Sequence, residues 1–270
     1  MAEQNNGVTI NLDMLGAKDL TLKLLGPVTE SAGKTLQDAW ELVFGGFGNY
    51  VEKKRITRRK DLEDFKKALE DRVNSIPENN LCEPPLSIIG PALEAAKYYF
   101  EEEKIREMFA STISASMDSR KAGRVHPSFP VIIQQMSSLD AKNLECFYRA
   151  DNALPLCEYR ICEKDGENDD FPLLLPGWTA QTNVFISNPQ MNDIEQGAAS
   201  ISSLARLGLI STAFDRSLTE AHYHMFAKTP KYLSLLEEYK SDAKHFPHIQ
   251  EGLARLTPLG ENLCAICFGG

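Results

Sequence analysis

The hydrophobic and polar residues of the first half of the chain recur with a helical period. From residue 35 to 47 the apolar side chains are three or four residues apart, which places them on one face of a helix. The Gly26-Pro27 pair predicts a break before this helix, because proline lacks the backbone N–H that a helix interior needs. The stretch 62–73 has the same apolar spacing and predicts a helix that ends before Pro77.

The central part of the chain contains a change of helical phase. The apolar residues from Leu86 to Phe100 share one phase, and those from Ile105 to Met117 share another. The shift predicts a kink or tight turn at 99–103, and hence two helices. Further on, Ser137 and Asp140 have the spacing of a capping box, which predicts the start of another helix.

The period of the pattern changes in the C-terminal half. Residues 157–162 alternate as in a strand, and 183–187 form a second candidate strand. The stretch 191–207 returns to helical spacing. We further expect a return strand that starts at Leu256 and a final helix after Gly260.

These elements predict a mainly α protein, with a helical N-terminal region followed by an α+β, winged-helix-like C-terminal unit with insertions. The expected divisions are a flexible arm over 1–17, a helical domain over 18–138 and a winged-helix-like domain over 139–270. A chain of 270 residues is long enough for two separate cores.

Charge and composition narrow the classes of partner. The formal net charge of −9 disfavours general coating of nucleic acid, so only local positive patches can bind it. The first residues show no basic region followed by an apolar one, so we expect no secretory signal and a cytoplasmic protein, peripheral at the inner membrane if it binds lipid. In that compartment the six cysteines are expected to be reduced.

A dense basic run follows the aromatic helix of residues 35–47 and marks the candidate binding segment. The aromatic helix fits an internal core, a contact with a partner helix or an amphipathic helix on an anionic membrane. The basic run fits a solvated helix face, and equally a site for lipid, phosphate or nucleic acid. The candidate membrane- or partner-binding residues are Trp40, Val43, Phe44, Phe47, Lys53, Lys54, Arg55, Arg58, Arg59 and Lys60.

The sequence offers no catalytic residue, cofactor site or metal site. It lacks G-x-S-x-G, the Walker lysine loop and H-E-x-x-H. Cys264 and Cys267 form a single C-x-x-C with apolar inner residues, whereas structural zinc sites usually have two such pairs. The stretch 191–207 has one basic residue, Arg206, so a winged helix here would make few phosphate contacts, and we favour a protein-binding use of it.

Three stretches of the chain resemble a known family. They are PLSIIGPALEAA, EEEKIREMFASTISASMD and VHPSFPVIIQQMSSLDAKNL, in that order. With the preceding LLGPVTESAG and its basic continuation, the resemblance to the bacterial Abi-alpha family spans most of residues 18–150, with a weaker echo at the C-terminus. It implies phage defence by growth arrest or death of the infected cell. It implies no particular reaction and no catalytic residues.

The leading hypothesis from the sequence is a non-enzymatic abortive-infection effector or sensor. It would act through protein contacts, with a protein partner or a second copy, and at an anionic membrane surface. One alternative is a winged-helix regulator that binds nucleic acid, either with that fold or through the basic run at 53–60. A second alternative is a cryptic enzyme or metalloprotein.

Overall fold

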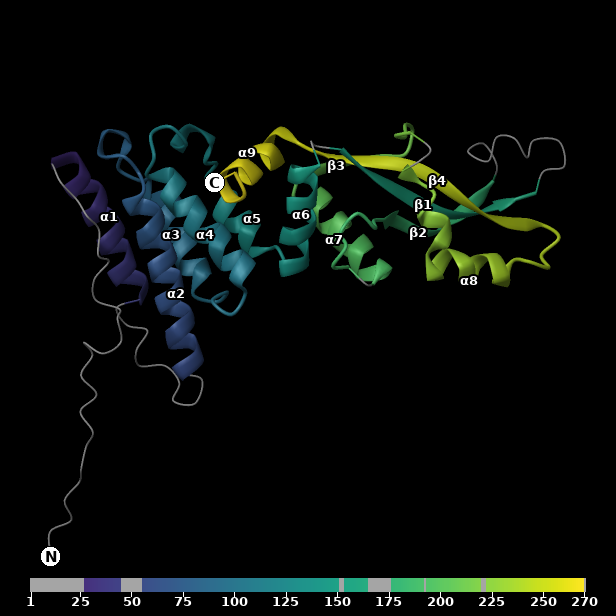
Figure 1. Ribbon diagram of the computed structural model, residues 1–270, viewed down its shortest axis with the longest axis horizontal. Helices are drawn as coiled ribbons and strands as arrows, with labels where there is room; N and C mark the ends of the chain where they lie inside the picture. The colour runs from purple at the N-terminus through teal and green to yellow at the C-terminus, as the bar shows by residue number, and fades with distance from the viewer. Residues whose placement is uncertain are drawn as a thin grey trace, which may run out of the picture. The chain divides into compact units, whose positions relative to one another are not determined.

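The computed structural model describes residues 27–44, 55–150, 153–164, 176–191, 193–219 and 222–269. The chain divides into two compact units between Gln135 and Met136. The helices of the first unit are α1 (Pro27–Phe44), α2 (Arg55–Asn74), α3 (Leu86–Ala96), α4 (Glu103–Ser116) and α5 (Phe129–Gln134) (Figure 1).

The helix boundaries of the first unit follow local sequence signals. Helix α1 begins at Pro27, where the Gly-Pro pair predicts a break, and α2 ends at Asn74, before Pro77. Helix α3 ends at Ala96 and α4 begins at Glu103, so the predicted division of the central stretch into two helices is confirmed. Proline acts on the local backbone, and a phase change is a local pattern of apolar side chains, so both can be recognised in the sequence.

The core of the first unit contains a group of four aromatic rings from two helices and one loop. Trp40 and Phe44 belong to α1, Phe65 to α2, and Phe100 lies between α3 and α4; each is at most 2% exposed. The centroid of Trp40 lies 4.4 Å from that of Phe44 and 5.8 Å from that of Phe65. Phe100 lies 5.9 Å from Phe44 and 5.7 Å from Phe65. The predicted apolar face of α1 is therefore part of this core.

The second unit combines helices with a sheet. Its elements are α6 (Ser138–Arg149), β1 (Ala153–Glu163), β2 (Gly177–Val184), α7 (Ile194–Arg206), β3 (Ile210–Ala213), a 3₁₀ turn (Phe226–Lys228), α8 (Pro230–Glu238), β4 (His245–Leu256) and α9 (Pro258–Cys267). Helix α6 starts with the predicted capping box: the Ser137 side chain accepts from Asp140 N (3.1 Å), and Asp140 Oδ2 accepts from Ser137 N (2.8 Å).

The four strands form one antiparallel sheet in the order β2-β1-β4-β3. Strand β1 pairs with β4 along its whole length, from Ala153 opposite Arg255 to Glu163 opposite His245. The expected mainly α fold with a winged-helix-like C-terminal unit is therefore wrong, and the fold is α+β. The two longest strands, β1 and β4, lie at the centre of the sheet. A winged-helix unit would instead have a small wing of strands beside a helical bundle.

Most of strand β4 is not predicted by the sequence pattern. We expect a return strand to start at Leu256, but β4 ends there and begins at His245. Its first five residues are all half-buried, so apolar and polar positions do not alternate, and Pro247 lies within it. By contrast, the predicted strand at 157–162 is confirmed within β1, and β2 ends at Val184, near the start of the other candidate strand.

Candidate functional site

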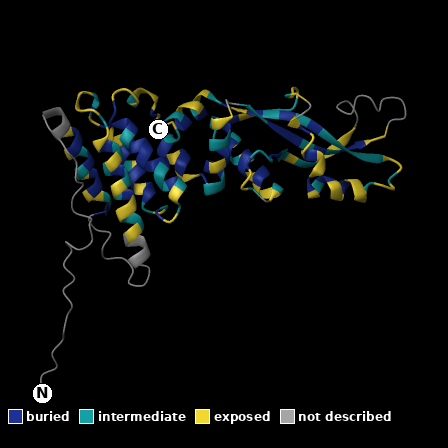
Figure 2. Ribbon diagram, viewed as in Figure 1, coloured by how far each residue is buried: buried dark blue, intermediate teal, exposed yellow. Residues whose placement is uncertain are grey.

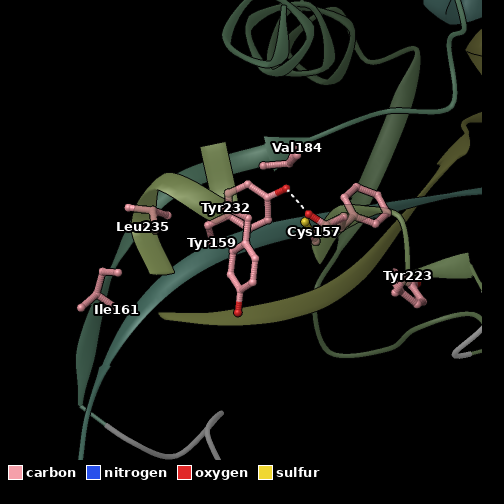
Figure 3. Packing of buried hydrophobic residues seen from close by; sticks show 8 residues of the cluster. Cys157, Tyr159, Ile161, Val184, Tyr223, Tyr232 and Leu235 are labelled. Atoms are coloured by element: carbon pink, nitrogen blue, oxygen red, sulfur yellow. Dashed lines mark hydrogen bonds between the residues drawn. The ribbon is translucent and has the colours of Figure 1, made fainter. Parts of the chain in front are cut away.

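One face of the sheet is covered by α8 and the 3₁₀ turn before it. A cluster of buried side chains fills the space between them, and Figure 3 shows these side chains together. The cluster consists of Cys157, Tyr159, Ile161, Val184, Tyr223, Phe226, Tyr232 and Leu235. Because alternate residues of β1 point to one face, Cys157, Tyr159 and Ile161 all reach this cluster. The packing fixes α8 against the sheet.

The hydroxyl of Tyr159 holds the start of α8. It donates to the Phe226 carbonyl (3.0 Å; dashed line in Figure 3) and lies 2.6 Å from Thr229 Oγ1. Thr229 is the N-cap of α8, and its Oγ1 accepts from Tyr232 N (3.3 Å). A central strand is thereby joined by hydrogen bonds to the first turn of the helix.

Two further tyrosines connect the same segment to β4. Tyr223 donates to the Gly252 carbonyl (2.7 Å), and Tyr232 donates to the Pro247 carbonyl (3.2 Å). Burial raises the pKa of Tyr159, Tyr223 and Tyr232 above the usual tyrosine value. The three hydroxyls therefore stay protonated at neutral pH and remain hydrogen-bond donors.

Helix α8 carries apolar side chains on its outer surface as well as its inner one. Tyr232 and Leu235 are 9% and 8% exposed, whereas Leu233 and Leu236 are 52% and 41% exposed. Exposed residues predominate along α8 in Figure 2. Because each residue turns a helix by about 100°, a helix with the pattern Tyr-Leu-Ser-Leu-Leu cannot bury all its apolar residues against one sheet.

The exposed leucines continue to the edge strand β2. Tyr239 follows Leu236 by three residues and is half-buried at the end of α8. The indole of Trp178 in β2 is 47% exposed and meets the Tyr239 ring edge-on, with centroids 6.4 Å apart. Leu233, Leu236 and Tyr239 follow one another at spacings of three residues, and Tyr239 contacts Trp178, so we group these four residues under the name apolar ridge.

The surroundings of the apolar ridge carry charges of both signs. Two ion pairs are Lys231–Glu195 (3.3 Å) and Lys240–Glu237 (3.3 Å), and Asp242 Oδ2 lies 3.1 Å from Nδ1 of His245. The ring of His245 also lies edge-on to Trp178, with centroids 5.3 Å apart. An apolar centre inside a polar rim of mixed charge is the composition of a protein–protein interface.

Asp242 fixes the turn that joins α8 to β4. Its Oδ1 accepts from the backbone N–H of Lys244 (2.6 Å) and of His245 (3.0 Å). The hydrogen bond from the Lys244 backbone N–H is the main reason that the pKa of Asp242 lies below its ordinary value, and the bond with the His245 side chain adds to it. The turn keeps the Tyr239 end of α8 close to His245 and Trp178.

Comparison with known proteins identifies the family. Residues 57–267 match a family model described as abortive infection alpha. The chain belongs to the Abi-alpha family. No curated protein and no solved structure matches this Abi-alpha chain. Membership indicates a role in abortive infection, a form of phage defence.

The family match differs in extent from the resemblance seen in the sequence. It begins after α1 and runs to residue 267, so it includes the whole C-terminal unit as far as α9. The apolar ridge of this Abi-alpha protein therefore lies inside the matched region. Helix α1, with Trp40 and Phe44, lies outside it.

The structure places the sequence-predicted binding residues in different environments. Trp40 and Phe44 are fully buried in the aromatic core, Val43 is half-buried and Lys60 is exposed on α2. Arg55, Arg58 and Arg59 belong to α2, but their side chains are outside the described part, and Phe47, Lys53 and Lys54 lie outside the described residues. In this arrangement Trp40 and Phe44 are covered by the protein's own core. Binding by the other residues of the set stays a prediction.

The cysteines and histidines do not assemble into a metal centre within the described ranges. No group of three or more histidine, cysteine, aspartate or glutamate side chains is placed there to hold an ion. Cys264 is buried in α9, and burial raises the pKa of its thiol. In the same ranges, no helix of this Abi-alpha protein is long and apolar enough to cross a bilayer.

The apolar ridge is absent from the sequence-predicted candidates. Its signal was the run Tyr232-Leu233-Ser234-Leu235-Leu236, which has apolar residues on two faces of a nine-residue helix. Such a run predicts one buried face and one exposed apolar face. Trp178 had no local signal, because its contact with Tyr239 joins distant parts of the chain.

Proposed function

We propose that this Abi-alpha protein is a non-enzymatic abortive-infection protein that binds another protein through the apolar ridge. The observation that carries the proposal is the exposure of Leu233, Leu236 and Trp178 side by side with Tyr239, on a helix that three tyrosines hold in place. Tryptophan, tyrosine and leucine on a fixed scaffold form contact surfaces at low entropic cost, because little freedom remains to be lost on binding.

The charges around the ridge favour a protein partner over a membrane or nucleic acid. Anionic lipid and nucleic acid select surfaces where positive charge dominates. Here Glu237 and Glu238 are exposed next to Leu236, and the neighbouring lysines Lys231 and Lys240 already form ion pairs with carboxylates. The rim therefore offers no excess of positive charge, but it can complement the mixed rim of a protein.

Phage plating on a host with inducible protein tests this proposal. We expect the unaltered protein to lower plaque counts while infected cells stop growing or die. The double variant Leu233→Asp/Leu236→Asp should lose this protection, because each substitution places a carboxylate in the contact and removes a residue worth about 2 kcal/mol if it is a hot spot. Both leucines are exposed, so the variant should fold, which circular dichroism and thermal melting can check.

A matched control is available in the first unit. Leu42 of α1 is 86% exposed, more than either ridge leucine, so Leu42→Asp makes the same chemical change outside the ridge. We expect Leu42→Asp to retain protection. If it loses protection while the folded ridge variant keeps it, the functional surface lies on α1 and the proposed role of the ridge is wrong.

A further inference from the structure

A second feature of the molecule, in the first unit, is a stretch of sequence with more cationic than acidic residues. Between Met108 and Leu139 the sequence has one acidic residue, Asp118, but three cationic ones, Arg120, Lys121 and Arg124, in a chain of net charge −9. All three cationic side chains are exposed. Residues 118–126, between α4 and α5, are here named the cationic loop.

A buried carboxylate fixes the first of these cations. Asp118 is 3% exposed, and its Oδ1 and Oδ2 accept from Arg120 Nε (2.8 Å) and Nη2 (2.6 Å), while Oδ1 also accepts from Arg120 N (3.0 Å). The hydrogen bonds from the Arg120 side chain are the main reason that the pKa of Asp118 lies below its ordinary value. The guanidinium has five N–H donors, so those on Nη1 remain for a ligand in an orientation that Asp118 sets.

The other two cations lie at the two ends of a tight turn, Lys121 as the N-cap of a 3₁₀ helix and Arg124 as its last residue. Lys121 N and Ala122 N both donate to the Asp118 carbonyl (2.8 and 2.7 Å), and Arg124 N donates to the Lys121 carbonyl (2.9 Å). In a 3₁₀ turn the side chains at positions i and i+3 eclipse each other. Lys121 and Arg124 are thus neighbours, and neither forms an ion pair among the described residues.

The loop is also attached to the segment that precedes α3. Ser119 N donates to the Asn80 carbonyl (2.8 Å), and Cys82 N donates to the Met117 carbonyl (2.8 Å). Val125 is 8% exposed and anchors the far end of the loop. The three cations therefore stand on a backbone with few alternative conformations, which lowers the entropic cost of binding a ligand.

We propose that the cationic loop binds the phosphate backbone of nucleic acid. Arginine and lysine side chains make most sequence-independent contacts of this kind. The large exposed apolar side chains of the described residues all lie outside 117–128, whereas membrane-binding surfaces combine cations with exposed apolar groups. The chemistry of the loop therefore favours nucleic-acid phosphates over a lipid surface. This site does not depend on the apolar ridge.

Fluorescence anisotropy with the full chain tests the proposal. The probes are a labelled single-stranded DNA of about 20 nucleotides and the matching duplex, in roughly 50 mM salt, with a dissociation constant of about 10⁻⁴ to 10⁻⁶ M expected for non-specific contacts. Because Asp118 neutralises Arg120, about two phosphate contacts are expected from Lys121 and Arg124, and log K should fall against log salt with a slope of about −1.4 to −1.8. Lys121→Glu/Arg124→Glu should weaken binding at least tenfold, since it removes two contacts and adds repulsion.

The control reverses two exposed lysines of the second unit, Lys240→Glu/Lys244→Glu, and should bind the DNA as the unaltered protein does. Thermal melting verifies that each variant is folded. The proposal is overturned if the unaltered protein does not bind at this salt, or if Lys121→Glu/Arg124→Glu binds as well as the control. Binding to phosphatidylserine vesicles without binding to either DNA would also overturn it, and would assign the loop to a membrane.

Discussion

At the scale of single residues, Trp40 combines strong packing with an unpaired polar group. Its indole is fully buried between aromatic neighbours, and its Nε1–H has no hydrogen-bond partner among the residues that the structure describes. An unpaired buried donor costs about 1–3 kcal/mol. The packing of a large aromatic side chain in a core is worth more than that, about 3–5 kcal/mol on truncation to alanine. The net effect of Trp40 should be to stabilise the first unit.

Two substitutions separate these contributions. We expect Trp40→Ala to lower the free energy of unfolding by about 3–5 kcal/mol, because it leaves a cavity among Phe44, Phe65 and Phe100. Trp40→Phe should cost much less, about 1 kcal/mol or under, since it keeps most of the ring packing and removes the unpaired donor. Urea denaturation of both variants measures the difference. Equal losses for the two would show that the N–H has a partner.

Because Trp40 is buried, a substitution at Trp40 is not a suitable test of membrane binding by α1. A charged substitution at Trp40 would place a carboxylate in the core, so loss of liposome binding would report unfolding as readily as loss of contact. For Trp40 to reach a lipid surface, α1 would have to leave Phe65 and Phe100. Leu42, which is exposed in the folded unit, is the position of α1 at which a substitution tests a surface role.

At the scale of elements, helix α8 depends on hydrogen bonds from the sheet beneath it. Removing the Tyr159 hydroxyl leaves the Phe226 carbonyl with the bonds from Thr229 Oγ1 (3.0 Å) and Thr229 N (3.3 Å), and it takes away the bond that joins this carbonyl to the sheet. We expect Tyr159→Phe to lower the free energy of unfolding by about 1–2 kcal/mol. Urea denaturation tests this, with Tyr98→Phe as the control, because Tyr98 is 70% exposed and should tolerate the change. No loss for Tyr159→Phe would mean that packing alone holds α8.

Elements with local causes were predictable from sequence, and those with distant causes were not. The capping box at Ser137 and the boundary between α3 and α4 each depend on a few neighbouring residues. Strand β4 depends on its partners: it lies between β1 and β3, and its side chains are half-buried on both faces at its start. A strand of this kind has no alternating pattern of apolar and polar residues. The sequence therefore did not indicate a long strand here, and a winged helix was predicted instead.

In the candidate site, too, features with local causes were predictable from sequence and features that depend on distant residues were not. The two-faced pattern of α8 was present in the sequence, but whether its outer leucines are covered depends on the rest of the fold. The contact of Trp178 with Tyr239 arises because β2 and the end of α8 meet at one end of the sheet. For Trp40 and Phe44, amphipathic spacing correctly predicted an apolar face, but spacing alone cannot distinguish a face that contacts the core from one that contacts a membrane.

At the scale of the whole molecule, the two units carry different surfaces. The second unit presents the apolar ridge, with leucines and aromatic rings inside a rim of mixed charge. The first unit presents the cationic loop. Both lie within residues 57–267, the part of the chain that matches the Abi-alpha family. An abortive-infection protein with this arrangement would contact a protein through one unit and a phosphate backbone through the other.

Site-specific photo-crosslinking during infection tests the contact at the ridge most directly. A photoreactive benzoylphenylalanine replaces Leu236 in one strain and Leu42 in another, and the cells are irradiated after phage addition. We predict a discrete protein adduct from position 236, absent from position 42 and lost when Leu233→Asp is added. If position 236 yields no adduct beyond that of position 42 while the protein still protects the culture, the apolar ridge is not the surface through which it acts.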